Sequence, residues 1–320
     1  MGLKGILFFA SIFVMALVSY PILSSNYFGR DSSVIESPLP EFLTKIFPNV
    51  LGENIYWKPS NTVIASVQKK PEITAVSAIV YDLSSDKLIY QKNPKKRLPL
   101  ASLTKVMTAI VALENEPIDK IFTVDKDAAE IGENTMGLSV GERLSLEDLL
   151  YGLILHSGND ASETIARGSK FGRNNFIFLM NKKAEDLGLT DTHFTNPSGL
   201  EGDGNQYSTV HDLLVVTRYA LENPIFQKIV STVDYEIPYT YEHKYIYLYN
   251  ETNLLTSYPG VKGVKTGYTD EAGLCLVTYL KHDGHRIIAV LLSAENRRQE
   301  MKDLLDYSLR SLGVTPPLHN

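Results

Sequence analysis

Cysteine is almost absent from this sequence: Cys275 is the only one in 320 residues. A single thiol cannot form an internal disulfide, and its position in a predicted strand excludes a lipid-modified cysteine near the amino terminus. Length and composition predict instead one domain of about 240 residues, which is large enough to bury a sizeable core.

The sequence also lacks an excess of positive charge. Its 31 Lys and Arg are outnumbered by 37 Asp and Glu, for a net charge of -6, and no basic patch with interleaved aromatic residues occurs. This balance argues against a nucleic-acid partner. His282 and His285 flank a glycine turn with no carboxylate placed like a catalytic glutamate, so we predict a surface turn there, and neither a metal nor a cofactor.

A long apolar run occurs only at the amino terminus, where residues 6–18 follow Lys4 and the run extends weakly through Leu23. It is long for the apolar part of a signal peptide and short for a full membrane span. Because no clear small-x-small cleavage site follows, we favour a signal anchor over a cleaved signal peptide in residues 1–25. We therefore expect an extracytoplasmic protein, anchored to the membrane by this segment or secreted. Residues 26–71 are predicted to be a linker or stalk, with one short helix at residues 40–46.

Three short motifs follow in the rest of the chain. They are Ser102-Leu103-Thr104-Lys105, Ser157-Gly158-Asn159 and Lys265-Thr266-Gly267. Each motif alone is weak, but in this order they supply a serine hydroxyl, two lysine amines, a second hydroxyl, an amide and a glycine-flanked strand. Together they predict an acyl-transfer site.

The first motif opens a predicted helix, since apolar residues with helical spacing follow it. Ser102 and Lys105 are three residues apart and share one face, so the amine can reach the hydroxyl. Lysine can act as a base here only if burial or a nearby cation lowers its pKa, and Lys265 is our candidate for that cation. The alternative is an N-cap serine with a solvent-facing lysine.

The second motif lies between two predicted helices. A capping box at Ser145-Leu146-Glu147-Asp148 starts the first helix, which ends at His156, and the next begins at Asp160. A rigid turn between them could aim Ser157 and Asn159 into a cleft, the first to relay a proton and the second to hold a substrate backbone group. The alternative is an ordinary turn.

The third motif lies in the first of three predicted strands, which cover residues 261–266, 273–280 and 286–293. Gly267 removes a side chain beside the strand edge, so a peptide could pair along that edge. The amides of Tyr268 and Ser102 would then form an oxyanion hole, and Lys265 would add charge. The alternative is a surface turn at the end of a strand.

Tyrosines cluster at residues 235–249, where Tyr239, Tyr241, Tyr245 and Tyr247 alternate as in a strand. Their rings could stack on glycan rings. The preferred interpretation is a solvated hairpin with amphipathic side chains.

Further strings lie around and between the motifs: Val80-Tyr81-Asp82, Leu100-Ala101-Ser102, Met107-Thr108-Ala109, Met180-Asn181-Lys182-Lys183-Ala184 and Asn196-Pro197-Ser198-Gly199-Leu200. With them, the chain resembles the serine-type D-alanyl-D-alanine carboxypeptidases from about Ile73 to Leu312. These are the low-molecular-mass penicillin-binding proteins of peptidase family S11. The resemblance implies an α/β fold of the β-lactamase/DD-peptidase type, with an antiparallel sheet flanked by helices and an inserted helical subdomain. The catalytic domain would cover residues 72–314, followed by a tail at 315–320.

The resemblance also implies roles for individual residues. Ser102 would be the nucleophile and Lys105 its general base, while Ser157 and Asn159 would assist proton transfer and peptide positioning. The implied substrate-binding residues are Lys265, Thr266, Gly267, Tyr268 and Arg297. Spacing to Leu304-Leu305 favours Arg297 over the adjacent Arg298 as the contact for the substrate's terminal carboxylate.

The implied reaction has two steps. Ser102 attacks the penultimate D-alanine carbonyl of a peptidoglycan stem peptide and expels the terminal D-alanine, and water then hydrolyses the acyl-enzyme. Because a β-lactam resembles the scissile amide, we expect penicillins to acylate the same serine and to inhibit the enzyme.

Other functions compete with this interpretation. Some relatives are D,D-endopeptidases, which cut peptidoglycan cross-links with the same nucleophile. A class A β-lactamase would carry a Glu-x-x-Leu-Asn string, which is absent between Asn159 and Lys265. A noncatalytic wall-binding homologue would have no chemical need for both lysines and both serines.

Overall fold

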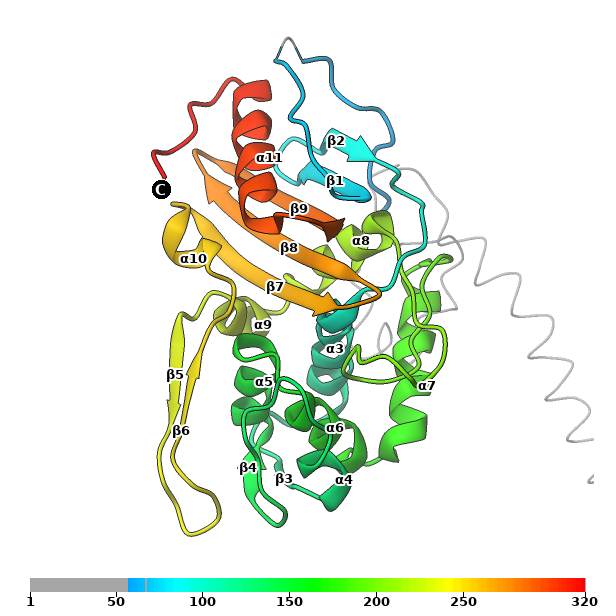
Figure 1. Ribbon diagram of the computed structural model, residues 1–320, viewed down its shortest axis with the longest axis vertical. Coiled ribbons are helices and arrows are strands. Elements are labelled where there is room, and N and C mark those ends of the chain that lie inside the picture. The colour runs from blue at the N-terminus through cyan, green and yellow to red at the C-terminus, as the bar shows by residue number, and fades with distance from the viewer. Residues whose placement is uncertain (1–56, 67, 320) are drawn as a thin grey trace, which may run out of the picture. The chain divides into compact units, whose positions relative to one another are not determined.

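The structure is a computed structural model that describes residues 57–66 and 68–319 (Figure 1). The predicted anchor at residues 1–25, the helix at residues 40–46 and most of the predicted stalk lie outside the described residues. No helix in the described part of the chain is both long and apolar enough to span a membrane.

A five-stranded antiparallel sheet forms the framework of the fold. Its spatial order is β2-β1-β9-β8-β7, so the first strands of the described chain pair with the last (Figure 1). The strands are β1 (Ser77–Asp82), β2 (Lys87–Lys92), β7 (Val261–Thr269), β8 (Gly273–His282) and β9 (His285–Ala294). The three carboxy-terminal strands confirm the prediction, although β7 runs on through Gly267 and Tyr268.

Both faces of this sheet are buried, because alternate residues of its strands enter different cores. On β9, Ile287, Ala289 and Leu291 pack with α11 (Arg297–Ser311). Ile288, Val290 and Leu292 belong to the core on the opposite face, which includes α3 (Lys105–Asn115) and α8 (Val210–Ala220). The predicted antiparallel sheet flanked by helices is therefore confirmed.

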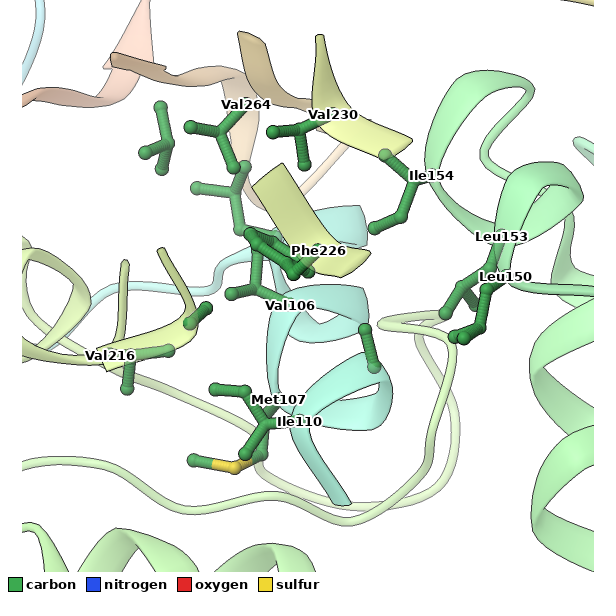
Figure 2. Close-up of a cluster of buried hydrophobic side chains, with 14 of the residues drawn as sticks. Val106, Met107, Ile110, Leu150, Leu153, Ile154, Val216, Phe226, Val230 and Val264 are labelled. Atoms are coloured by element: carbon green, nitrogen blue, oxygen red, sulfur yellow. The ribbon is translucent and has the colours of Figure 1, made fainter. Parts of the chain in front are cut away.

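The helical region is inserted between β2 and β7. It contains α4 (Lys126–Ala129), α5 (Leu146–Leu155), α6 (Asn159–Gly168), α7 (Gly172–Asp186), α9 (Pro224–Val230) and α10 (Leu254–Ser257), with the small strands β3 (Ile121–Thr123), β4 (Arg143–Ser145), β5 (Asp234–Ile237) and β6 (Ile246–Tyr249). Figure 2 shows part of the core that joins this region to the sheet. There Val106 and Ile110 of α3 lie among side chains that include Phe226 of α9 and Val264 of β7.

Two local predictions bear on the site. The helix start predicted at Ser145 is confirmed, since the Ser145 hydroxyl accepts a hydrogen bond from the Asp148 amide and donates one to the Asp148 carboxylate, and α5 ends at Leu155. The first motif differs from a simple helix start: Ala101–Thr104 form a 3-10 turn, η1, before α3 begins at Lys105. Ala101 has a φ of 47°, an uncommon conformation for a residue with a side chain. The turn therefore presents Ser102 ahead of the helix.

Candidate active site

The three predicted motifs meet at one cleft of about 350 Å³, between β7 and the helical region. The lining residues are Ser102, Glu133, Asn134, Ser157, Asn159, Gly199, Leu200, Glu251, Thr266, Gly267, Tyr268, Thr269 and Arg297. Lys105 and Lys265 lie beneath this lining and are buried. All the residues predicted for the site are thus in or directly below one cleft.

Lys105 is held in place by three oxygen atoms. Its Nζ lies 3.0 Å from Oγ of Ser102, 2.7 Å from Oδ1 of Asn159 and 2.6 Å from the carbonyl oxygen of Ser198. A neutral amine has two N–H donors and one lone pair. If the amide and carbonyl oxygens take the two donors, the lone pair faces the Ser102 hydroxyl. The predicted pairing of serine and lysine is confirmed, and the alternative of a solvent-facing lysine is wrong.

The electrostatics of the cleft favour that neutral amine. Burial lowers the pKa of Lys105 well below its ordinary value, and the positive charge of Lys265 lowers it further. Burial also lowers the pKa of Lys265, to about 8; Arg297 acts in the same direction and Glu251 in the opposite one. Lys265 thus contributes the cation that the sequence analysis expected beside Lys105, although burial is the larger cause.

The second motif forms a tight turn between α5 and α6. Ser157 has a φ of 56° and is almost fully buried. Such strain in a residue with a side chain is typical of functional sites. The hydroxyl lies in the cleft wall, where an incoming group could bind it.

The Asn159 side chain makes different hydrogen bonds from those that the sequence predicts. The sequence predicts that its amide holds a substrate backbone group. In the structure its Oδ1 accepts a hydrogen bond from Lys105, and its Nδ2 donates to the carbonyl oxygen of Gly132 at 3.2 Å. Asn159 therefore orients the lysine as well as lining the cleft.

The loop that supplies Glu133 and Asn134 is attached to the second motif. Asp160 is fully buried, and its carboxylate accepts hydrogen bonds from the amides of Met136 at 3.0 Å and Leu138 at 2.9 Å. The Asn159 amide donates to the carbonyl oxygen of Asn134 at 2.8 Å. These bonds position the loop as one wall of the cleft.

Two glycines allow other segments to approach the η1 turn closely. A Cβ on Gly267 would lie 3.1 Å from the Ser102 amide nitrogen and 3.2 Å from the Leu100 carbonyl oxygen. A Cβ on Gly199 would lie only 1.9 Å from the Ala101 carbonyl oxygen, and Gly199 has a φ of 90°. Gly267, which is predicted to leave the strand edge open, therefore also leaves room for the backbone of Ser102.

The structure distinguishes Arg297 from Arg298 by their surroundings. Arg297 lines the cleft and donates a hydrogen bond from Nη1 to the Gly267 carbonyl oxygen at 2.7 Å. Arg298 is exposed and is not part of the cleft wall. The preference for Arg297 agrees with this placement, and its contact with a carboxylate stays a prediction.

Sequence reasoning missed several parts of the site. It gave no role to the Ser198 carbonyl group, although the string from Asn196 to Leu200 had been noticed, and it missed Glu133, Asn134 and Glu251. These residues belong to loops with no periodic pattern, so only their tertiary neighbours reveal them. Tyr268 and Thr266 lie at the cleft as predicted.

The histidine turn has a structural explanation. His285 Nδ1 lies 2.8 Å from Oδ2 of the buried Asp82, and residues 283 and 284 form the turn between β8 and β9. Among the residues that the structure describes, no three His, Cys, Asp or Glu side chains gather as metal ligands would.

Comparison with known proteins agrees with this geometry. The family model described as D-alanyl-D-alanine carboxypeptidase matches residues 64–296. The chain is 34% identical over 250 residues to D-alanyl-D-alanine carboxypeptidase DacF of Bacillus subtilis, covering 76% of this chain and 64% of DacF, just under two thirds of its length. It is 28% identical to a D-alanyl-D-alanine endopeptidase of Pseudomonas aeruginosa, covering 75% of this chain and 77% of that protein.

A solved structure extends the comparison to the fold. The Streptomyces K15 DD-transpeptidase is 31% identical and superposes with a TM-score of 0.72, covering 76% of this chain and all of the other. Fold, motif order and family model agree, and this chain belongs to the D-alanyl-D-alanine carboxypeptidases of peptidase family S11.

Proposed function

We propose that this protein is a serine-type D-alanyl-D-alanine carboxypeptidase that removes the terminal D-alanine from peptidoglycan stem pentapeptides. The observation that carries the proposal is the buried Lys105 amine 3.0 Å from the Ser102 hydroxyl, at the base of an open cleft. Family membership supports the same reaction.

Acylation begins with proton transfer. The neutral Lys105 amine takes the proton of the Ser102 hydroxyl as Oγ attacks the penultimate D-alanine carbonyl. The amides of Ser102 and Tyr268 stabilise the oxyanion. Ser157, which lines the cleft, relays a proton to the leaving amine, and D-alanine departs. Water then hydrolyses the ester and restores Ser102.

The positive side of the cleft recognises the substrate's carboxylate. Lys265 and Arg297 supply charge, and the Thr266 hydroxyl supplies a hydrogen bond. A peptide that pairs with the edge of β7 would place its terminal carboxylate at these residues and its penultimate carbonyl at Ser102. The same recognition would admit penicillins, which acylate Ser102 and deacylate slowly.

The proposal also includes where in the cell the enzyme acts. Export by residues 1–25, retained as an anchor or cleaved, would bring the enzyme to its peptidoglycan substrate outside the cytoplasm. Neither a nucleic acid nor a cofactor takes part in the proposed reaction.

The test incubates the full-length protein, with Ser102→Ala as control, with pentapeptide muropeptides and with cross-linked muropeptide dimers, followed by mass spectrometry. Loss of one alanine mass from the pentapeptide, absent in the control, is the expected result. Conversion of dimers to monomers in its place would make the protein an endopeptidase, the activity named for the Pseudomonas aeruginosa relative. No change in either substrate would favour a noncatalytic wall-binding protein.

A further inference from the structure

The hairpin of β5 and β6 has one buried face and one exposed face. Its inward residues Ile237, Ile246 and Leu248 belong to the main core. On the other face, Tyr245, Tyr247 and Tyr249 are 51%, 53% and 47% exposed. Because alternate residues of extended chain point to the same side, these three rings form a row that begins just before β6 and continues along it. We call this row the tyrosine face.

The tyrosine face rests on a firmly held support. Next to it, Tyr235 stacks on Tyr151 of α5 with ring centroids 3.6 Å apart, and its hydroxyl donates to Asp148 at 3.1 Å. Near the turn of the hairpin, Arg143 pairs with Glu242 through both its backbone amide and its side chain. Figure 1 shows the hairpin running alongside α5 and β4. The hairpin that carries the tyrosine face is therefore held in place before a ligand binds, which reduces the entropy lost on binding.

Exposed aromatic side chains are concentrated on this hairpin. Among the described residues, ten large hydrophobic side chains are exposed, and five of them are its tyrosines: Tyr239, Tyr241, Tyr245, Tyr247 and Tyr249. Scattered exposed apolar residues are normal, but a contiguous group of them marks an interaction site.

The polar residues of the tyrosine face indicate what would bind there. Asp234 pairs across the hairpin with Tyr249, and Glu236 with Tyr247. Burial and the nearby Glu236 carboxylate raise the pKa of Tyr245. Neither strand contributes a lysine or an arginine, and Lys244 in the loop of the hairpin pairs with Glu142. The face therefore does not suit an anionic membrane or a nucleic acid. Flat rings beside carboxylate acceptors suit a sugar, whose C–H groups can stack and whose hydroxyl and amide groups can donate.

The tyrosine face also begins at the cleft. Tyr249 is the last residue of β6, and Glu251, two residues later, lines the cleft. The Glu251 amide donates to the carbonyl oxygen of Leu155, just before the second motif. Because one residue separates Tyr249 from Glu251 of the cleft wall, a polymer that carries a peptide in the cleft could lay its sugar backbone along the tyrosine face.

We propose that the tyrosine face binds the glycan strand of peptidoglycan while a stem peptide occupies the cleft. This inference rests on the proposed function, because it takes the attached peptide as the substrate. It makes the hairpin a second subsite for the alternating amino sugars of the polymer, and it replaces the interpretation of the tyrosines as merely solvated side chains.

The test uses the full chain and a triple variant, Y245A/Y247A/Y249A, with Y245F/Y247F/Y249F as matched control. The probe is peptide-free glycan strands prepared from sacculi with an amidase, and calorimetry measures their binding. We expect the alanine variant to bind at least about tenfold more weakly, which corresponds to about 1.4 kcal/mol. The phenylalanine control should bind within about threefold of the parent chain, because it keeps the rings.

A second readout separates this inference from the proposed function. Both variants should hydrolyse a short soluble pentapeptide without sugars, and react with penicillin, at the parent rate. If the parent chain binds glycan but cleaves no pentapeptide, the proposed function fails and the binding surface stands. If the alanine variant binds glycan as the parent does, the inference is overturned. It is also overturned if the parent binds anionic vesicles but not glycan, or if light scattering shows that the tyrosines only join two copies of the chain.

Discussion

Replacing Gly267 with alanine should impair catalysis much more than folding. The added Cβ would lie 3.1 Å from the Ser102 amide nitrogen, 3.2 Å from Cβ of Ala101 and 3.2 Å from the Leu100 carbonyl oxygen. Ordinary van der Waals contact for a Cβ begins at 3.4 Å, so β7 and the η1 turn must separate by a few tenths of an ångström. The methyl group would also crowd the amide expected to hold the oxyanion.

The two effects of this substitution differ in size. Loss of one oxyanion-hole donor lowers the rate by about 10²–10³, or about 2.7–4 kcal/mol in the barrier. Overpacking costs about 1–3 kcal/mol of folding free energy, of which alanine recovers about 0.5–1 kcal/mol by restricting the unfolded chain. We therefore expect acylation to slow by about 100-fold or more, with a loss of stability of at most about 2.5 kcal/mol.

The assay follows acylation of Ser102 by a fluorescent penicillin in stopped flow, with thermal denaturation in parallel. Gly260→Ala is the matched control. It immediately precedes β7, seven residues and roughly 23 Å away along extended chain. Its φ is 93°, and an added Cβ would lie 2.6 Å from the Lys281 carbonyl oxygen. It should lower stability and leave the acylation rate of the folded protein unchanged. Wild-type acylation by Gly267→Ala would refute the assigned oxyanion hole.

Three further outcomes test the charges of the site. With rising pH, penicillin acylation should increase as Lys105 loses its proton, because its pKa lies well below that of an ordinary lysine, and should decline above about pH 8 as Lys265 loses the charge that binds the carboxylate. A rate that keeps rising at high pH would contradict this assignment. Arg297→Gln should raise KM for a pentapeptide about tenfold or more with a smaller change in kcat, whereas the exposed Arg298→Gln should change neither in steady-state assays. Asp160→Asn should destabilise the protein by about 1.5–3 kcal/mol in urea unfolding, because its buried carboxylate then binds the loop amides less strongly; an unchanged midpoint would argue against that role.

Local features of the chain were predictable because their causes are local. The N-cap at Ser145 starts α5, and a short polar turn joins β8 to β9, since both depend on a few consecutive residues. The partnership of Ser102 and Lys105 also follows from spacing, because three residues span about one turn of helix. Motif order was sufficient to group the residues of the cleft before any coordinates were known.

The sequence by itself therefore determined the chemical groups of the site and the type of the elements that carry them. Tertiary structure decided which groups meet: Asn159 binds Lys105, the Ser198 carbonyl group completes the lysine's environment, and Arg297 rather than Arg298 reaches the cleft. It also left Tyr245, Tyr247 and Tyr249 exposed on one side of the hairpin. The physical reason is that these contacts join residues far apart in the chain, so they depend on how helices and sheet pack together and have no periodic or local signal in the sequence.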